Sequence, residues 1–426
     1  MNSIALRLCL GVLPLCFCAP MNAQLPSIHQ LFPEGSAALS AGEKDNGVDF
    51  HLDGTLSMRG FARAAGGQFP QLLQDLDLAF SGAWKPDNIH YSRFGGSVID
   101  PITQRPFYAV AANESFFKGT KEYQKTQIEN VFRRTVPGQL NIVMTDLFEQ
   151  DLDISAIQQS LDAASFPAKS SLAVWQWQMP FDGTIYDYDF RNSEGRAYKG
   201  ERYLYMLALG SRESIEELNK AITRTVTIKG WKYLLLSKQL AADSSNWLHV
   251  TRTNNAALKT HNDSLPVYRI SRGCDAAELT SAIQLAPEVD APVEFSFPGA
   301  YQVSLFALIK GKESWQTHEL TGPEARAVKD PSGHPGLQVK ISCSAVSSAG
   351  QTVLRIRRVG TDDDVKLPPW VDQSSATNAE FDSPENLKSA KWGEKTLNLK
   401  PFLRELATKA VAGTTIATAY VYVVSD

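Results

Sequence analysis

The strongest constraint on the fold is an alternation of two patterns between residues 46 and 224. Short apolar runs typical of buried strands alternate with segments whose apolar residues recur at helical spacing. The strand-like runs are 47–54, 88–95, 139–146, 171–181 and 202–210, and the helix-like segments are 69–80, 121–135, 153–164 and 211–222. This order predicts an α/β fold with a doubly wound, mostly parallel sheet that helices cover on both faces.

From residue 225 the pattern changes to short runs in which apolar and polar residues alternate, with turn residues between them. Such runs predict a mainly antiparallel, sandwich-like β domain. We expect two helices within it, at 275–285 and 399–412, and we expect the polar, acidic segment 361–378 to be mobile. The chain has 426 residues, and at about 150 residues per domain we expect two domains, at 46–224 and 225–426.

The first 23 residues have the composition of a secretory signal peptide. They hold one basic residue, Arg7, an apolar run over residues 8–17 and a small residue at Ala23. We therefore expect export, to the periplasm or out of the cell. Cys16 and Cys18 suggest a lipoprotein signal, but the residue before each is large, where a small one is expected.

The rest of the chain is expected to be a mildly acidic protein without an integral membrane segment. Residues 24–45 are rich in Ser, Ala, Gly and Pro and are expected to form a leader that packs little. No later segment has 18 consecutive apolar residues. The formal net charge is −4, and −5 without Arg7, which argues against a nucleic-acid partner because such a partner requires a basic face.

Two cysteines, Cys274 and Cys343, remain after the signal peptide. In an oxidising compartment such a pair forms a disulfide more often than a metal site. Two buried free thiols are the alternative.

Two acidic residues follow predicted strands of the first domain. Asp53 ends the run 47–53, and Asp146 follows the run 139–145. In open α/β sheets, ligands bind beyond the carboxyl ends of the strands. Carboxylates beside hydroxyl side chains form a set of hard oxygen donors, so we expect a divalent cation, Mg²⁺, Ca²⁺ or Mn²⁺.

The stretch HLDGTL at 51–56 also allows an enzymatic interpretation. It is similar to the DxDGTL loop of the haloacid dehalogenase family, in which the first Asp is the nucleophile. His51 occupies that position here, and a histidine cannot form the aspartyl-phosphate of that chemistry. The acidic run at 360–364, which could supply the later acidic pair of that family, belongs to the predicted β domain.

The stretch DGTLS at 53–57 resembles the DxSxS motif of the von Willebrand factor A family, with Asp53, Thr55 and Ser57 at its three positions. The resemblance covers roughly residues 46–224 and implies a doubly wound, Rossmann-like sheet with a metal-ion-dependent adhesion site. That site takes a further threonine from a second loop and an aspartate from the end of a later strand. Thr120 and Asp146 match these positions, and Ser115 and Thr126 are alternatives to Thr120.

Two departures from the motif are expected to weaken metal binding: Thr55 replaces a serine, and the bulky Leu56 replaces a small residue. Each predicted ligand also has a purely structural interpretation. Asp53 and Asp146 could cap a turn or a helix, and the hydroxyls of Thr55 and Ser57 could bond nearby backbone groups. The aromatic segment 175–190 is interpreted as a buried strand and hairpin, with an exposed ligand surface as the alternative.

The favoured function is an exported binding protein that is not an enzyme. The resemblance implies that its metal site accepts an acidic side chain of a protein ligand. The sequence contains no HExxH, GxSxG, GxxxxGK[ST] or GxGxxG motif, and its seven histidines lack ligand spacing. A metal-assisted hydrolase and a structural assembly component with an inactive site are the alternatives.

Overall fold

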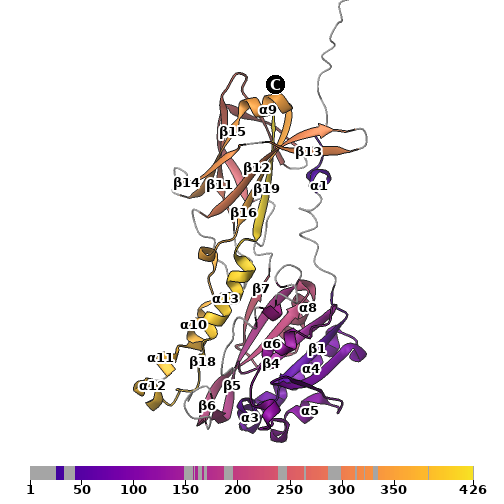
Figure 1. Cartoon of the computed structure of the whole chain (residues 1–426), viewed down its shortest axis with the longest axis vertical. Helices are drawn as coiled ribbons and strands as arrows, with labels where there is room; N and C mark the ends of the chain where they lie inside the picture. The colour runs from indigo at the N-terminus through magenta and orange to yellow at the C-terminus, as the bar shows by residue number, and fades with distance from the viewer. Residues whose placement is uncertain are drawn as a thin grey trace, which may run out of the picture.

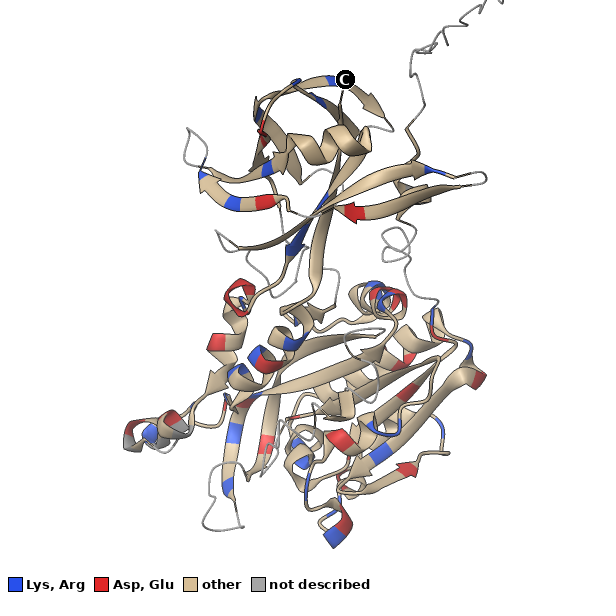
Figure 2. Cartoon of the chain, turned by 45° about the horizontal axis from the view of Figure 1, so that its top comes forward, with Lys and Arg blue, Asp and Glu red and all other residues tan. Residues whose placement is uncertain are grey.

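The fold was taken from a computed structural model, which describes residues 25–32, 44–147, 157, 159–161, 166, 170–186, 195–237, 247–262, 265–285, 299–311, 314–320, 322–329, 334–381 and 383–425. Figure 1 shows two lobes: an α/β lobe with one large sheet, and a β lobe that holds the C-terminus. Basic and acidic residues are interspersed along both lobes (Figure 2).

The α/β lobe is built on a seven-stranded sheet with the order β3-β2-β1-β4-β6-β5-β7. The strands are β1 (Gly47–Asp53), β2 (Ile89–Gly95), β3 (Val98–Pro101), β4 (Gln139–Thr145), β5 (Ser171–Ile185), β6 (Arg196–Gly210) and β7 (Lys232–Leu236). The expected strands of the first domain are therefore confirmed.

The large sheet is mixed, so the prediction of a mostly parallel sheet is wrong. Among the described residues, the pairs β1–β2 and β1–β4 are parallel, and the pairs β2–β3, β4–β6, β5–β6 and β5–β7 are antiparallel. In the second half of the sheet the reason is that β5 and β6 form a hairpin of two 15-residue strands. A hairpin reverses the chain, whereas a parallel pair requires a crossover.

Helices cover both faces of the large sheet, as expected. One face carries α3 (Arg59–Arg63), α4 (Gln68–Ala83), α5 (Phe107–Ala111) and α8 (Arg212–Thr225). The other face carries α6 (Ile128–Phe132) together with α10 (Pro369–Ser374) and α13 (Leu399–Val411), which come from the far end of the chain. Figure 1 shows α10 and α13 alongside this lobe.

Two predicted helices of the first domain differ from the structure. The segment 121–135 forms two short helices, η4 (Lys121–Tyr123) and α6, instead of one continuous helix. The helix predicted at 153–164 lies mostly outside the described residues. The remaining short helices of this lobe are η1 (Leu56–Met58), η2 (Pro86–Asn88) and η3 (Glu114–Phe116).

The β lobe consists of two sheets that enclose a common core. One sheet has the order β13-β12-β16-β19-β10-β9 and the other has the order β14-β15-β11-β8. Their strands are β8 (Leu248–Asn254), β9 (Ala256–Asn262), β10 (Leu265–Ile270), β11 (Ala276–Ile283), β12 (Ala300–Lys310), β13 (Trp315–Leu320), β14 (Glu324–Lys329), β15 (Pro335–Ser342), β16 (Gln351–Val359) and β19 (Thr415–Val424). Among the described residues, all strand pairs of these two sheets except β10 with β19 are antiparallel, so the expectation of a mainly antiparallel unit is confirmed.

The helix predicted at 275–285 is wrong, because this segment forms β11. Ala277, Leu279 and Ser281 are buried in alternation with more exposed neighbours, which is the two-residue period of a strand. Pairing with β15 on one side and β8 on the other fixes the extended conformation. The helix predicted at 399–412 is confirmed as α13.

The segment expected to be mobile, 361–378, instead contains η5 (Asp362–Asp364), α10 and β17 (Ser375–Ala376). Asp364 is buried and accepts hydrogen bonds from Arg358 and from the backbone and side chain of Thr361. Trp370 and Val371 enter the core on the α6 side of the large sheet. Beyond this segment lie α11 (Asn378–Phe381), α12 (Pro384–Lys388) and β18 (Thr396–Leu397), which pairs with β17.

The boundary expected at residue 224 falls inside the α/β lobe. Strand β7 follows that residue and pairs with β5 of the large sheet. The leader expected to pack little also makes contacts: α1 (Ile28–Leu31) is followed by Phe32 in a buried cluster with Phe306 and Tyr422 of the β lobe.

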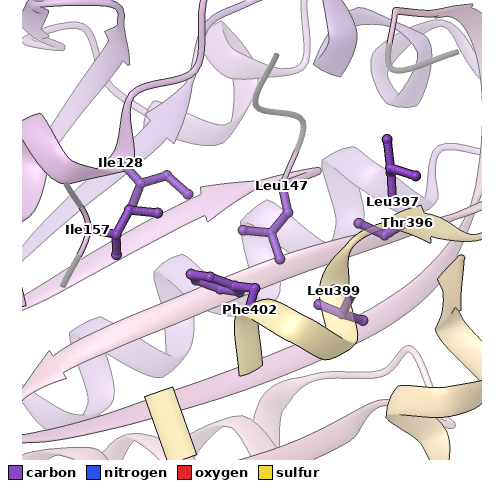
Figure 3. A pocket seen from close by; sticks show the side chains of 7 residues that line it. All are labelled: Ile128, Leu147, Ile157, Thr396, Leu397, Leu399 and Phe402. Carbon is purple, nitrogen blue, oxygen red and sulfur yellow. The ribbon is translucent and has the colours of Figure 1, made fainter. Parts of the chain in front are cut away.

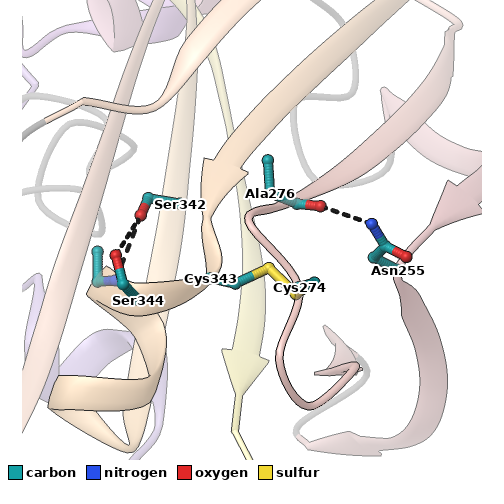
Figure 4. The surroundings of a disulfide bond; sticks show 7 residues. Asn255, Cys274, Ala276, Ser342, Cys343 and Ser344 are labelled. Atoms are coloured by element: carbon teal, nitrogen blue, oxygen red, sulfur yellow. Dashed lines mark hydrogen bonds between the residues drawn. A yellow bond between two sulfur atoms is a disulfide. The ribbon is translucent and has the colours of Figure 1, made fainter.

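The cysteines Cys274 and Cys343 form the expected disulfide, with Cα atoms 5.8 Å apart. Cys274 lies in the turn before β11, and Cys343 begins α9 (Cys343–Ala349) (Figure 4). Among the described residues, no helix is both long enough and apolar enough to cross a membrane.

Candidate metal centre

The two predicted acidic ligands lie at the same edge of the large sheet. Strands β1 and β4 are parallel neighbours, with Leu52 opposite Met144. Asp53 ends β1, and Asp146 comes directly after the last residue of β4. Their side chains join a group of polar residues that we call the rim cluster, which consists of Asp53, Thr55, Ser57, Thr126, Thr145 and Asp146.

Asp53 is the centre of the rim cluster. Its Oδ1 accepts a hydrogen bond of 2.9 Å from the backbone N–H of Thr55. Its Oδ2 accepts hydrogen bonds from the Oγ1 hydroxyls of Thr126, at 2.7 Å, and of Thr145, at 2.8 Å. The side chain of Asp53 is fully buried.

The hydroxyl groups connect Asp53 to the second acid. Thr55 Oγ1 lies 3.0 Å from Ser57 Oγ and 3.5 Å from Thr126 Oγ1. Ser57 Oγ donates a hydrogen bond of 3.1 Å to Asp146 Oδ1. Four of the five predicted ligands, Asp53, Thr55, Ser57 and Asp146, therefore lie in one hydrogen-bonded group.

The fifth predicted ligand, Thr120, lies outside the rim cluster. It is exposed at the N-terminus of η4, and the alternative Ser115 is exposed as well. Thr126, the other alternative, belongs to the rim cluster instead. Because α6 begins at Ile128 and not near residue 121, Thr126 is the threonine just ahead of that helix.

The loop that carries Thr126 is held by Arg93 of β2. The Arg93 guanidinium donates to Tyr123 Oη at 3.0 Å and to the carbonyl of Phe116 at 3.1 Å, and pairs with Asp100 at 3.1 Å. Gly54 accepts a hydrogen bond of 2.9 Å from the backbone N–H of Lys118. A Cβ atom at Gly54 would lie 2.3 Å from Arg93 Cγ, so this close approach requires glycine.

The two acids of the rim cluster have different electrostatic surroundings. Burial raises the pKa of Asp53, and its hydrogen bonds from Thr55, Thr126 and Thr145 oppose that rise only in part. Those three partners are neutral. Asp146, in contrast, lies 3.6 Å from the guanidinium of Arg202, and both side chains are almost fully buried.

The donors of the rim cluster fit a hard divalent cation. They are carboxylate and hydroxyl oxygens, which are the ligands that Mg²⁺ and Ca²⁺ prefer. Asp53 is a buried carboxylate bonded by neutral groups, and a cation beside it would offset the cost of its burial. Among the described residues, no three His, Cys, Asp or Glu side chains lie together.

Leu56 packs against the loop that leads to Thr126. It is half-buried between Thr55 and Ser57, and its Cδ1 lies close enough to Gly119 that a Cβ there would be 2.9 Å away. The expected weakening of metal binding by this bulky side chain stays a prediction.

A small apolar hollow is lined in part by Leu147, the residue after Asp146 (Figure 3). The volume open to the centre of a water-sized sphere is about 10 Å³, which is at the lower limit for one water molecule and too small for an organic ligand. Leu147, which follows Asp146, points into it and has a backbone φ of 56°. The lining residues are Ile128, Leu147, Ile157, Thr396, Leu397, Leu399 and Phe402.

No family model matches this chain. A search of curated proteins also finds no match. The resemblance to the von Willebrand factor A family therefore depends on the motif residues and remains a prediction.

The described residues that suggested a phosphatase loop or an aromatic ligand surface are engaged in polar pairs or in the core. His51 bonds Ser92 of the neighbouring strand, and burial lowers its pKa to about 4, so it is neutral at pH 7. Asp364 of the acidic run 360–364 is paired with Arg358. Trp175, Trp177 and Phe181 are buried in the core, which contradicts the alternative of an exposed aromatic surface at these three positions. Asp187 and Asp189 lie outside the described residues.

Proposed function

We propose that this chain is an exported binding protein whose rim cluster holds a hard divalent cation and thereby binds an acidic side chain of a protein ligand. The observation that carries the proposal is the meeting, in one hydrogen-bonded group, of Asp53 and Ser57 from the loop after β1 with Thr126 from the loop before α6. The proposal rests on the donor set and the motif order, and it leaves the partner's identity open.

Each part of the rim cluster has a distinct role in this proposal. A bound divalent cation supplies positive charge and an open coordination position for a ligand carboxylate. Asp53 provides the buried negative charge, while Ser57 and Thr126 contribute neutral oxygens that leave the cation's charge largely uncompensated. Arg93 orders the loop before Thr126 through its hydrogen bond to the carbonyl of Phe116.

A structural role without a cation is the second candidate. The observation that favours it is burial: the side chains of Asp53, Thr55, Ser57, Thr126 and Asp146 are all within the interior and already accept or donate hydrogen bonds within the protein. In that case the rim cluster would only fix the loops at the sheet edge.

The proposal is tested by comparing Thr126→Val with Thr120→Val. Both variants remove one hydroxyl and keep the side-chain shape, but only Thr126 belongs to the rim cluster. Purified protein is used to capture proteins from envelope extract in Mg²⁺ or in chelator. We expect wild type and Thr120→Val to capture a protein in Mg²⁺ but not in chelator. In Mg²⁺ we expect Thr126→Val to capture at least tenfold less of it. Equal capture by all three proteins, with or without chelator, would contradict the proposal.

A further inference from the structure

Arg202 is a buried positive charge beside the rim cluster that the sequence motif does not include. Its side chain is 2% exposed, and its Nη2 lies 3.6 Å from Asp146 Oδ2. The guanidinium also packs over the ring of Phe181, 5.5 Å from the ring centroid. The other oxygen of Asp146 accepts the hydrogen bond from Ser57, so one carboxylate joins Arg202 to the rim cluster.

The antiparallel direction of β6 brings Arg202 to this place. Strand β6 pairs with β4 so that Tyr205 is opposite Thr145, the last residue of β4. Since β6 is antiparallel to β4, the residues before Tyr205 continue past the carboxyl end of β4, where Asp146 lies. The antiparallel β6 therefore places the charged side chain of Arg202 at the edge of the sheet where the predicted metal ligands meet.

We propose that Arg202 is an internal counter-cation of Asp146 that lowers the affinity of the rim cluster for divalent cations. This inference rests on the proposed function. A guanidinium stays charged at all accessible pH values, so it cannot yield its place to a metal by losing a proton. A divalent cation bound beside Asp146 is repelled by this charge in a poorly screened interior. Divalent cation binding then requires Asp146 to be shared with, or released from, Arg202.

The test is calorimetric titration with Mg²⁺ and with Mn²⁺ of wild type, Arg202→Gln and Lys199→Gln. Lys199 is the matched control, because it lies on the same strand and carries the same charge but is exposed and pairs with Asp182. We expect Arg202→Gln to bind at least tenfold more tightly than wild type, and Lys199→Gln to bind as wild type does. An affinity of Arg202→Gln equal to or weaker than that of wild type would overturn the inference.

Unfolding supplies a second readout. In chelator we expect Arg202→Gln to melt at a lower temperature than wild type, because Asp146 loses the positive charge of Arg202. We expect Mg²⁺ to raise the melting temperature of Arg202→Gln by more than that of wild type. Folding of Arg202→Gln only in Mg²⁺ would support the inference for the same reason.

If Arg202→Gln folds neither in chelator nor in Mg²⁺, the inference is tested by NMR spectroscopy of the wild-type protein. The Nε–H resonance of Arg202, assigned by its absence in Arg202→Lys, should shift when Mg²⁺ saturates the protein, and an unchanged resonance would overturn the inference.

The two proposals fail in different ways. If wild type binds a cation through Asp53 but Arg202→Gln binds no more tightly, only the role of Arg202 is wrong. If neither wild type nor Arg202→Gln binds a cation, the metal centre itself is wrong.

Discussion

At Asp53, burial and hydrogen bonding act on one carboxylate in opposite directions. Burial disfavours the ionised form and raises the pKa, while the hydrogen bonds from three threonines favour that form. Burial has the larger effect. The folded protein therefore holds the Asp53 proton to a higher pH than the unfolded chain does, and ionisation of Asp53 opposes folding near neutral pH.

Replacement of Asp53 by Asn should show this effect in chelator. Below pH 3.8 the carboxyl is protonated in both the folded and the unfolded wild type, so it brings no charge penalty. As the pH rises through the folded pKa, wild type loses stability and Asp53→Asn does not. We expect the unfolding free energy of Asp53→Asn, relative to wild type, to increase between pH 4 and pH 7 in urea titrations.

Asp182→Asn is the control for this prediction, because Asp182 is a partly exposed carboxylate paired with Lys199 at the surface. A difference between wild type and Asp53→Asn that stays constant over this pH range would contradict the assignment of a raised pKa to Asp53.

The residues of the rim cluster show what local pattern can reveal. Asp53, Thr55 and Ser57 follow one strand at fixed spacing, and Asp146 follows another, so the sequence could indicate them. Thr126 was ambiguous because it depends on where a short helix begins. Arg202 gave no sequence signal, since a single charged residue in a strand becomes informative only when the direction of that strand is known.

At the scale of elements, α13 shows that a local sequence pattern can predict a helix without predicting what the helix packs against. Its helical periodicity was visible in the sequence, and the helix runs over Leu399–Val411 as expected. Its packing partner was not visible. The apolar stripe of α13 lies in the same core as Val143 and Leu207 of the large sheet, more than 190 residues earlier in the chain.

Truncation of Phe402 to Ala should therefore destabilise the α/β lobe. Phe402 is buried in the core of that lobe and lines the small hollow, where a further loss of volume cannot be filled easily. We expect a loss of about 3–5 kcal/mol in the free energy of unfolding, measured with urea. Arg404→Ala, at an exposed position of the same helix, should change it by less than about 0.5 kcal/mol. Equal effects of the two substitutions would show that α13 does not stabilise this lobe.

Strand β11 illustrates the opposite case. Its alternating small and apolar residues are compatible with a short helix, and only pairing with β15 and β8 selects the extended form. Local propensity is a weak guide where two neighbouring strands supply most of the stabilisation.

Over the whole molecule, the two lobes are not consecutive along the chain. The segment 25–32 packs on the β lobe, residues 44–236 hold the elements of the large sheet, and α10 and α13 return to that sheet before β19 completes the β lobe. The sequence predicted the α/β and β units, but it could not predict this exchange of segments. The hydrophobic periodicity of a segment does not indicate which distant segment it contacts.

The antiparallel placement of β6 between β4 and β5 is the difference with the largest consequence. Alternating strands and helices favour parallel pairing, and the hairpin connection overrides that preference in the second half of the large sheet. The same reversal brings Arg202 to the rim cluster, so the departure from the expected fold and the proposed control of cation affinity have one cause.

The most direct measurement is anomalous scattering from a crystal of the wild-type protein soaked in Mn²⁺. We expect one peak at the carboxyl end of β1 and β4, within about 2–2.6 Å of oxygens of Asp53, Ser57 or Thr126, and no peak there in Asp53→Asn. The absence of any peak among these residues, or a peak that persists in Asp53→Asn, would contradict a metal centre in the rim cluster.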